Sequence, residues 1–150
     1  MEVPPEERFG MVVPALFEII GKIAKAVDKR FGADGRNLLR QVMGERGAEM
    51  GELMKPLSPG DDFKSVGTFF ARAVKMFGIE NQAEAKENEV VIKVPKCPYG
   101  LEGTNRELCE AMMNFDMRVV QTMGPNVKME IVKAVAVGDP CCELSLKPKK

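Results

Sequence analysis

The chain has 150 residues, of which 22 are Lys or Arg and 22 are Asp or Glu, so its formal net charge is zero. A balanced charge gives no positive field to hold a polyanion, which argues against a dedicated nucleic-acid binder. The sequence contains no histidine. This excludes Ser-His-Asp and Cys-His nucleophile systems, His-Glu-x-x-His zinc proteases and histidine-ligated haem.

The N-terminal segment gives no sign of export. It begins MEVPPEE, which is acidic where a signal peptide is basic, and no uncharged apolar run approaches the roughly 20 residues of a membrane span. A mass of 16.6 kDa and 45% apolar residues suit one domain that folds without disulfides. We therefore expect a single cytoplasmic domain over residues 1–150 with no membrane span.

The first half of the chain predicts helices after a short arm. Residues 1–10 are acidic and contain two prolines, and we expect them to form an N-terminal arm. Apolar residues at three- and four-residue spacing predict a helix over 11–31, and the break GADG at 32–35 separates it from a second helix that ends near residue 55. A third helix is predicted over 61–77, which completes a helical part over 11–78.

Three glycines form a stripe of small residues on the second predicted helix. Gly44, Gly47 and Gly51 are three and four residues apart. Each costs about 1 kcal/mol relative to alanine in a helix, which indicates close approach of another helix or of a ligand. We favour helix packing. If the protein binds a ligand, Met50 and Met54 beside these glycines predict an apolar cavity between helix and sheet that reaches the cysteines.

The second half of the chain predicts strands around one helix. Strands are expected over 79–86, 90–94, 127–131 and 142–146, with a helix that begins at a Thr104–Glu107 capping box and ends before Gly124. The predicted fold is α+β, with N-terminal helices followed by β-β-α-β-β. We expect an antiparallel sheet with helices packed on one face, and residues 79–147 as the part that carries the cysteines.

Four cysteines stand at 97, 109, 141 and 142 without any Cys-x-x-Cys spacing, so zinc-ribbon, ferredoxin and thioredoxin motifs are not supported. Nucleotide-binding glycine motifs are absent as well. Cys97 follows a predicted strand, Cys109 lies in an early turn of the next helix and Cys142 begins the last strand, so these three are expected at one end of the sheet. Strand alternation turns Cys142 inward and Cys141 to the opposite face. Plain burial, metal ligation and a reactive thiol all remain open.

Asp116 shares a helix stripe with Cys109. The two are seven residues apart, a rise of about 10.5 Å, so they cannot easily hold one metal ion. They can line one pocket with Met113 between them. A solvated aspartate is the other interpretation.

The run Cys97-Pro98-Tyr99, then Cys109, Asp116 and finally Gly138-Asp139-x-x-Cys142 resembles the 4-vinyl reductase domain family and its relative, the thiazoline-carboxylate hydrolase-like family. The resemblance covers roughly residues 90–146. It implies a fold like that of transport-protein-particle subunits, a buried apolar pocket, and cysteines that hold zinc or sense redox state. By position it implies a site of Cys97, Cys109 and Cys142, with Tyr99, Met113, Asp116 and Cys141 around it and Asp139 in the turn that presents Cys142.

Three functions compete. The first is a domain that binds a small apolar or amphipathic ligand, or senses a metal or redox state, with zinc as the candidate cofactor ahead of an iron–sulfur cluster. The second is a hydrolase that opens a small cyclic C–N bond, in which Asp116, Asp139 or a lysine must carry the proton because histidine is absent. The third is a structural protein that forms a homodimer.

Overall fold

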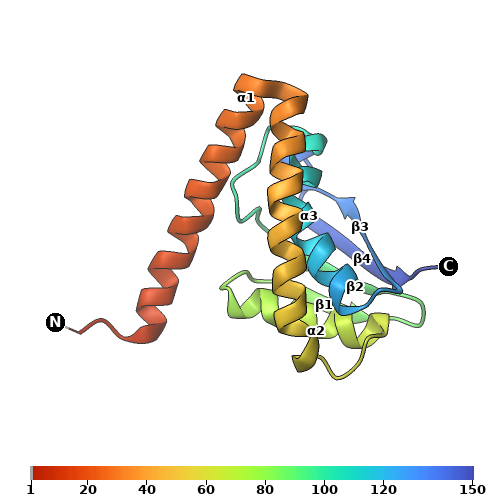
Figure 1. Ribbon diagram of the computed structural model, residues 1–150. Helices are drawn as coiled ribbons and strands as arrows, with labels where there is room; N and C mark the ends of the chain where they lie inside the picture. Colours follow the sequence, from red (N-terminus) through yellow and green to blue (C-terminus); the bar gives the residue numbers. More distant parts are fainter. Residues whose placement is uncertain (1) are drawn as a thin grey trace.

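The computed structural model describes residues 2–150 and shows helices that pack on one four-stranded sheet (Figure 1). The main elements in chain order are α1 (Pro5–Met54), α2 (Phe63–Met76), β1 (Gln82–Ala85), β2 (Val90–Val94), α3 (Arg106–Met123), β3 (Val127–Lys133) and β4 (Cys142–Pro148). Short 3-10 turns lie at Lys55–Leu57 and Val135–Val137. This order confirms the predicted α+β class with helices followed by β-β-α-β-β.

The long helix α1 is broken at Gly32, which has a positive φ of 56° and a ψ of −131°. Only glycine adopts such a conformation readily, so the predicted break between two helices is confirmed. The chain reverses there, and the second half of α1 runs back along the domain while the N-terminal end of the first half stands apart (Figure 1). The predicted N-terminal arm is wrong. Residues 5–10 are already helical because a proline at the first helical position needs no amide partner.

The sheet is antiparallel throughout, with strand order β1-β2-β4-β3. One face carries the buried side chains Val90, Ile92, Leu144, Leu146 and Met129, which pack beneath α2 and α3. The other face carries charged residues, including the ion pairs Lys93–Glu143 and Lys128–Glu130. Helices therefore cover one face only, as the alternation of the strands predicts.

The glycine stripe of α1 packs against α3. A Cβ at Gly47 would overlap the carbonyl oxygen of Phe115, and one at Gly51 would lie 2.6 Å from Cβ of Thr122. The missing side chains thus let the two helices approach closely, and α3 is the main neighbour of α1. The helix-packing interpretation of the three glycines is confirmed.

Two boundaries in the second half differ from prediction. Helix α3 is capped by Asn105, whose Oδ1 accepts from the Leu108 amide at 2.8 Å, whereas the hydroxyl of Thr104 donates to the Leu101 carbonyl at 2.6 Å. The predicted Thr104–Glu107 capping box is therefore wrong. Strand β1 spans only Gln82–Ala85, since Asn81 is buried and uses its side-chain amide to bind the Ala71 carbonyl at 3.0 Å.

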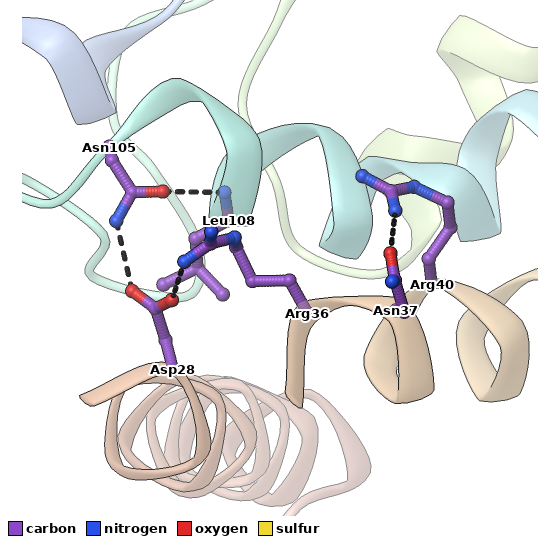
Figure 2. A network of polar contacts seen from close by, with 6 residues as sticks. All are labelled: Asp28, Arg36, Asn37, Arg40, Asn105 and Leu108. Atoms are coloured by element: carbon purple, nitrogen blue, oxygen red, sulfur yellow. Dashed lines mark hydrogen bonds and ion pairs between the residues drawn. The ribbon is translucent and has the colours of Figure 1, made fainter. Parts of the chain in front are cut away.

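A network of polar contacts joins both halves of α1 to the start of α3 (Figure 2). The carboxylate of Asp28 accepts from Arg36 at 2.6 Å and from the side-chain amide of Asn105 at 2.9 Å, while Asn105 also caps α3. Burial opposes the charge of Asp28, yet the hydrogen bonds from Arg36 and Asn105 outweigh it and lower the pKa of this carboxyl. The network fixes the fold of the helical hairpin.

We expect Asp28→Ala to destabilise the protein by about 1–3 kcal/mol near neutral pH, because charged hydrogen bonds are lost on both sides. A carboxyl whose folded pKa is lowered adds stability above its unfolded pKa and loses it as the pH falls through the folded pKa. The effect of the substitution should therefore shrink in acid. Urea unfolding at neutral and acidic pH measures it, with the exposed Glu52→Ala on the same helix as control. Equal effects at both pH values would contradict this account.

Candidate functional site

Three of the cysteines lie at one end of the sheet, on three different elements. Cys97 follows β2, and its Sγ accepts from the Leu101 amide at 3.5 Å. Cys109 is buried in the second turn of α3, and Cys142 begins β4 opposite Val94 of β2. The Sγ of Cys142 accepts from the amide of Val135 at 3.5 Å. Backbone amides of two turns, at Leu101 and Val135, therefore orient the sulfurs of Cys97 and Cys142.

The three thiols influence one another electrostatically. The pKa of Cys109 is raised to about 11, chiefly by burial, and Cys142 and Cys97 contribute to the same rise. Burial also raises the pKa of Cys142, against the opposing hydrogen bond from Val135. The sulfurs thus share one neighbourhood, and Cys109 and Cys142 are neutral thiols at neutral pH.

The arrangement does not support the predicted zinc site. Within residues 2–150, no three His, Cys, Asp or Glu side chains lie close enough together to hold a metal ion. Structural zinc needs four ligands at about 2.0–2.3 Å, and the Asp116 carboxylate lies two helical turns beyond Cys109. All four cysteines are free thiols, so the adjacent pair Cys141 and Cys142 forms no disulfide in this structure.

The alternation of β4 places Cys142 with the inward side chains of Leu144 and Leu146. Cys142 packs against the core in this position. Cys141 lies just before the strand and is half-buried as well. Its role in the site remains a prediction.

Cysteine reactivity should follow this geometry. We expect Cys109 to be the slowest of the four thiols to react with iodoacetamide near pH 8, because it is buried and its pKa is about 11. Peptide mass spectrometry over a time course measures the order, and unfolding in urea should make all four rates similar. Rapid labelling of Cys109 in the folded protein would contradict the burial.

Asp116 lies on the sheet-facing side of α3, one turn from the buried residues Met112 and Val120. Its environment raises the pKa of the carboxyl to about 7, because burial disfavours the charged form. In residues 2–150 this carboxylate has no hydrogen bond to another residue, although its oxygens are not fully sealed from solvent. The sequence analysis left a solvated aspartate as one interpretation, and in the structure Asp116 is half-buried on the stripe of α3 that carries Met112 and Val120.

Tyr99 faces the same neighbourhood. Burial raises the pKa of its phenol, and the charges of Asp116 and Cys97 act in the same direction. Its ring also contacts Phe17 of α1 edge-on, with the ring centroids 5.3 Å apart. Tyr99 therefore lies within electrostatic range of Asp116 and Cys97.

Asp139 acts on the backbone. Its Oδ2 accepts from the Ala134 amide at 2.9 Å, and its own amide donates to the Ala134 carbonyl at 3.3 Å. These bonds close the turn whose Val135 amide contacts Cys142. Asp139 thus supports the turn that presents Cys142, as the family resemblance implied.

Met113 is half-buried against the core, one turn of α3 from Cys109. One open hollow of about 330 Å³ lies beside Gly44 and is lined by polar residues such as Asn37 and Arg118. Another of about 480 Å³ lies along β3. Neither is lined by a cysteine or by Asp116. A Cβ at Gly44, Gly47 or Gly51 would meet α3, so this helix fills the space that the three glycines leave, and the apolar cavity remains a prediction.

The first half of α1 covers the segment after Cys97, which sequence reasoning missed. Gly21 lies against the backbone carbonyl of Tyr99, and the Lys25 ammonium donates to the Gly100 carbonyl at 3.0 Å. Gly21 and Ala24 are small and buried, whereas most other residues of the first half of α1 are exposed or half-buried. Small residues on the apolar face were the signal that another backbone approaches there.

The fold is an α+β domain with three cysteines at one end of its sheet, and with Tyr99 and the half-buried Asp116 on the segments that lie near them. The family model for L-2-amino-thiazoline-4-carboxylic acid hydrolase matches residues 16–146. The chain therefore belongs to this family, in agreement with the resemblance carried by its last third. A search of curated proteins gave no significant match.

Two solved structures show the same fold at low sequence identity. The phenol-responsive sensory domain of the transcription activator PoxR with phenol has a TM-score of 0.61 and 13% identity, covering 88% of this chain and 74% of that one. A trafficking protein particle complex subunit 3 from Naegleria fowleri, covalently bound to palmitic acid, has a TM-score of 0.66 and 18% identity, covering 92% and 95%. No helix within residues 2–150 has the length and low charge to cross a membrane.

Proposed function

We propose that the protein binds a small, partly apolar molecule beside Cys97, Cys109 and Cys142, with Tyr99 and Asp116 as its polar contacts. Asp116 carries the proposal. The half-buried Asp116 has no hydrogen bond to another described residue, and its surroundings disfavour the charged carboxylate and raise its pKa. A ligand that supplies a hydrogen-bond donor would satisfy this carboxylate.

The site chemistry limits the ligand class. The surface around the proposed ligand is weakly polar, because it consists of thiols, Met113 and the ring of Tyr99. Two groups can make hydrogen bonds to a ligand. The Tyr99 hydroxyl can donate one, and the Asp116 carboxyl can accept one when charged or donate one when protonated. The ligands named for the structural neighbours, phenol and palmitic acid, are both small molecules with an apolar body and one polar end. This supports an amphipathic ligand.

Thermal unfolding tests the proposal with three probes: phenol, palmitic acid and L-2-amino-thiazoline-4-carboxylic acid. A ligand at one hundred times its dissociation constant adds about 2.7 kcal/mol, which for this size raises Tm by about 5–10 °C. We expect a rise for at least one probe, retained in Glu107→Gln and lost in Asp116→Asn. Glu107 is an exposed carboxylate on the same helix. No rise with any probe, together with no adduct in native mass spectrometry, would contradict the proposal.

A hydrolase is the second candidate, favoured by the family and by the pKa of Asp116. A carboxyl with a pKa of about 7 is well matched to take a proton from water at neutral pH. Hydrolysis adds one water across a ring C–N bond, so mass spectrometry of L-2-amino-thiazoline-4-carboxylic acid after incubation detects it directly. We expect turnover to be lost in Asp116→Asn and kept in Glu107→Gln. Binding without turnover would leave only the first candidate.

Metal or redox sensing by Cys97, Cys109 and Cys142 would extend the first proposal. Their mutual electrostatic influence supports a shared role, but the thiols would have to move closer together to hold zinc. Elemental analysis of anaerobically purified protein tests this. About one zinc per chain, lost in Cys142→Ser, would support it, and metal-free protein that still binds ligand would overturn it.

A further inference from the structure

A polar hollow lies in the groove between the second half of α1 and α3. Its volume of about 330 Å³ reaches the range of small-molecule sites. One face of α1, where side chains recur every three or four residues, lines the hollow together with two residues of α3 that are four apart. The polar lining residues are Asn37, Arg40, Gln41, Glu45, Asn114 and Arg118. The candidate site described above uses none of these residues.

The hollow contains two guanidinium groups without a carboxylate partner. Within residues 2–150, neither Arg40 nor Arg118 forms an ion pair with Asp or Glu, whereas the nearby Arg36 is paired with Asp28. A guanidinium has five N–H donors in a planar fork that matches the oxygens of a carboxylate or a phosphate. Arg40 and Arg118 therefore offer donors to an anion in the hollow.

Local hydrogen bonds hold Arg40 in place. Its Nη1 donates to Oδ1 of Asn37 at 2.8 Å (Figure 2), and its backbone carbonyl accepts from the side-chain amide of Asn114 at 2.8 Å. Asn114 can lie there because Gly44 has no side chain to occupy the same space. These contacts use one of the five N–H groups of Arg40 and join the two helices that line the hollow.

The charges that line the hollow favour an anion with several oxygens. Glu45 is negative, and its Oε1 accepts from the side-chain amide of Gln41 at 3.1 Å. The guanidiniums of Arg40 and Arg118 outweigh this charge among the described lining residues. One guanidinium is enough to bind both oxygens of a carboxylate. Two guanidiniums on different helices match the three terminal oxygens of a phosphate group better.

We propose that this hollow binds the phosphate group of a phosphate monoester. Arg40 of α1 and Arg118 of α3 bind the phosphate oxygens from the two sides of the groove, and the side-chain amide of Asn37 is a further donor beside Arg40. The bound phosphate bridges the two helices. The proposal does not depend on which ligand binds beside Asp116.

Titration calorimetry of the full chain with glycerol 3-phosphate tests the site at constant ionic strength, with glycerol in sodium chloride as the control. We expect saturable binding to wild type. Arg40→Gln and Arg118→Gln should each weaken it about tenfold or more, because each removes charged hydrogen bonds. The matched control is Arg72→Gln, an exposed arginine of α2 outside the hollow, which should bind like wild type. No saturable binding to wild type would overturn the proposal.

Two further variants distinguish a shaped site from diffuse positive charge. Glu45→Gln removes the opposing charge and should strengthen binding. Arg118→Lys keeps the charge but loses the planar fork, so its affinity should lie between those of wild type and Arg118→Gln. Equal affinity of wild type, Arg118→Lys and Arg40→Gln/Arg118→Gln would indicate an adventitious ion only and overturn the proposal. Circular dichroism checks that each variant is folded, and the two arginines lie on different helices, so either one alone keeps the test decisive.

Vesicles identify the source of the phosphate. Phosphatidic acid carries the same phosphate monoester as glycerol 3-phosphate, but in a membrane. Wild type might sediment with phosphatidylcholine vesicles that contain phosphatidic acid while Arg40→Gln/Arg118→Gln does not, and this result would assign the hollow to a lipid headgroup. Binding of free glycerol 3-phosphate without sedimentation would assign it to a soluble ligand. Either result supports a phosphate site, and binding to neither would overturn it.

Discussion

The free energy of unfolding of wild type is expected to fall between about pH 4 and pH 8, whereas that of Asp116→Asn should not fall in this way. The stability of the variant relative to wild type should therefore increase as the pH rises. Burial raises the folded pKa of Asp116 to about 7, whereas an unfolded aspartate has a pKa near 4. Between these values the unfolded chain binds fewer protons than the folded chain, so wild-type stability falls as the pH rises and levels off above about 7. Asparagine has nearly the same shape and carries no proton to lose, so it removes this dependence.

The size of the effect is set by the pKa shift. About three pKa units correspond to at most roughly 4 kcal/mol, and the partial solvent contact of the carboxyl reduces this to about 2–3 kcal/mol. Urea unfolding at about pH 4, 6 and 8 measures it for wild type, Asp116→Asn and the exposed control Glu107→Gln. If the new amide costs the same free energy at every pH, it shifts the whole plot of unfolding free energy against pH for Asp116→Asn. The slope of that plot is unchanged by this cost, so the slope is the quantity to compare with wild type. Parallel curves for all three proteins would show that Asp116 is not in an apolar environment.

This prediction also bears on function. Residues that bind or react with a ligand often lower the stability of the fold. A carboxyl near a tyrosine and thiols that destabilises the fold at neutral pH is therefore a candidate for such a role. If Asp116→Asn gains stability at about pH 8 and loses ligand binding, the two results together identify a site. A gain in stability with unchanged binding would leave Asp116 as a buried acid without a role in the ligand contacts.

Much of the fold could be predicted because local patterns and packing agree. Alternation in β4 turns Cys142 inward with Leu144 and Leu146, and a strand end, an early helical turn and a strand start must meet at one edge of the sheet. Capping was less predictable: Thr104 and Asn105 are both good caps, and the choice depends on Thr104 bonding to Leu101 and Asn105 to Asp28.

The candidate site was only partly predictable, because two of its determinants are contacts between distant segments. Phe17 and Gly21 lie on a helix about 80 residues before Tyr99, and nothing in their spacing identifies the segment that they cover. The environment of Asp116 depends on the rotation of α3 about its own axis, because this decides which side chains of the helix face the sheet. A helical stripe shared with Cys109 permits burial of that carboxyl but does not require it.

Gly47→Ala should destabilise the protein by about 3 kcal/mol, although alanine is the better helix former by about 1 kcal/mol. Gly47 lies where the second half of α1 crosses α3, and a Cβ there would overlap the carbonyl oxygen of Phe115. A backbone atom in the middle of a helix cannot turn aside as a flexible side chain can. The two helices must therefore separate, which weakens the packing along the whole glycine stripe.

The same substitution at two other glycines separates packing from helix propensity. Gly10→Ala has no atom within 4 Å of the new Cβ and should stabilise the helix by up to about 1 kcal/mol. Gly44→Ala meets mainly the side-chain amide of Asn114, which can shift at the expense of its bond to the Arg40 carbonyl, so its cost should lie between the other two. Urea unfolding of the three variants should thus rank Gly10→Ala above Gly44→Ala and Gly47→Ala last. If Gly47→Ala were more stable than wild type, α1 would not contact α3 at this glycine. The close packing of the two helices, which holds Asp116 over the sheet, would then be contradicted.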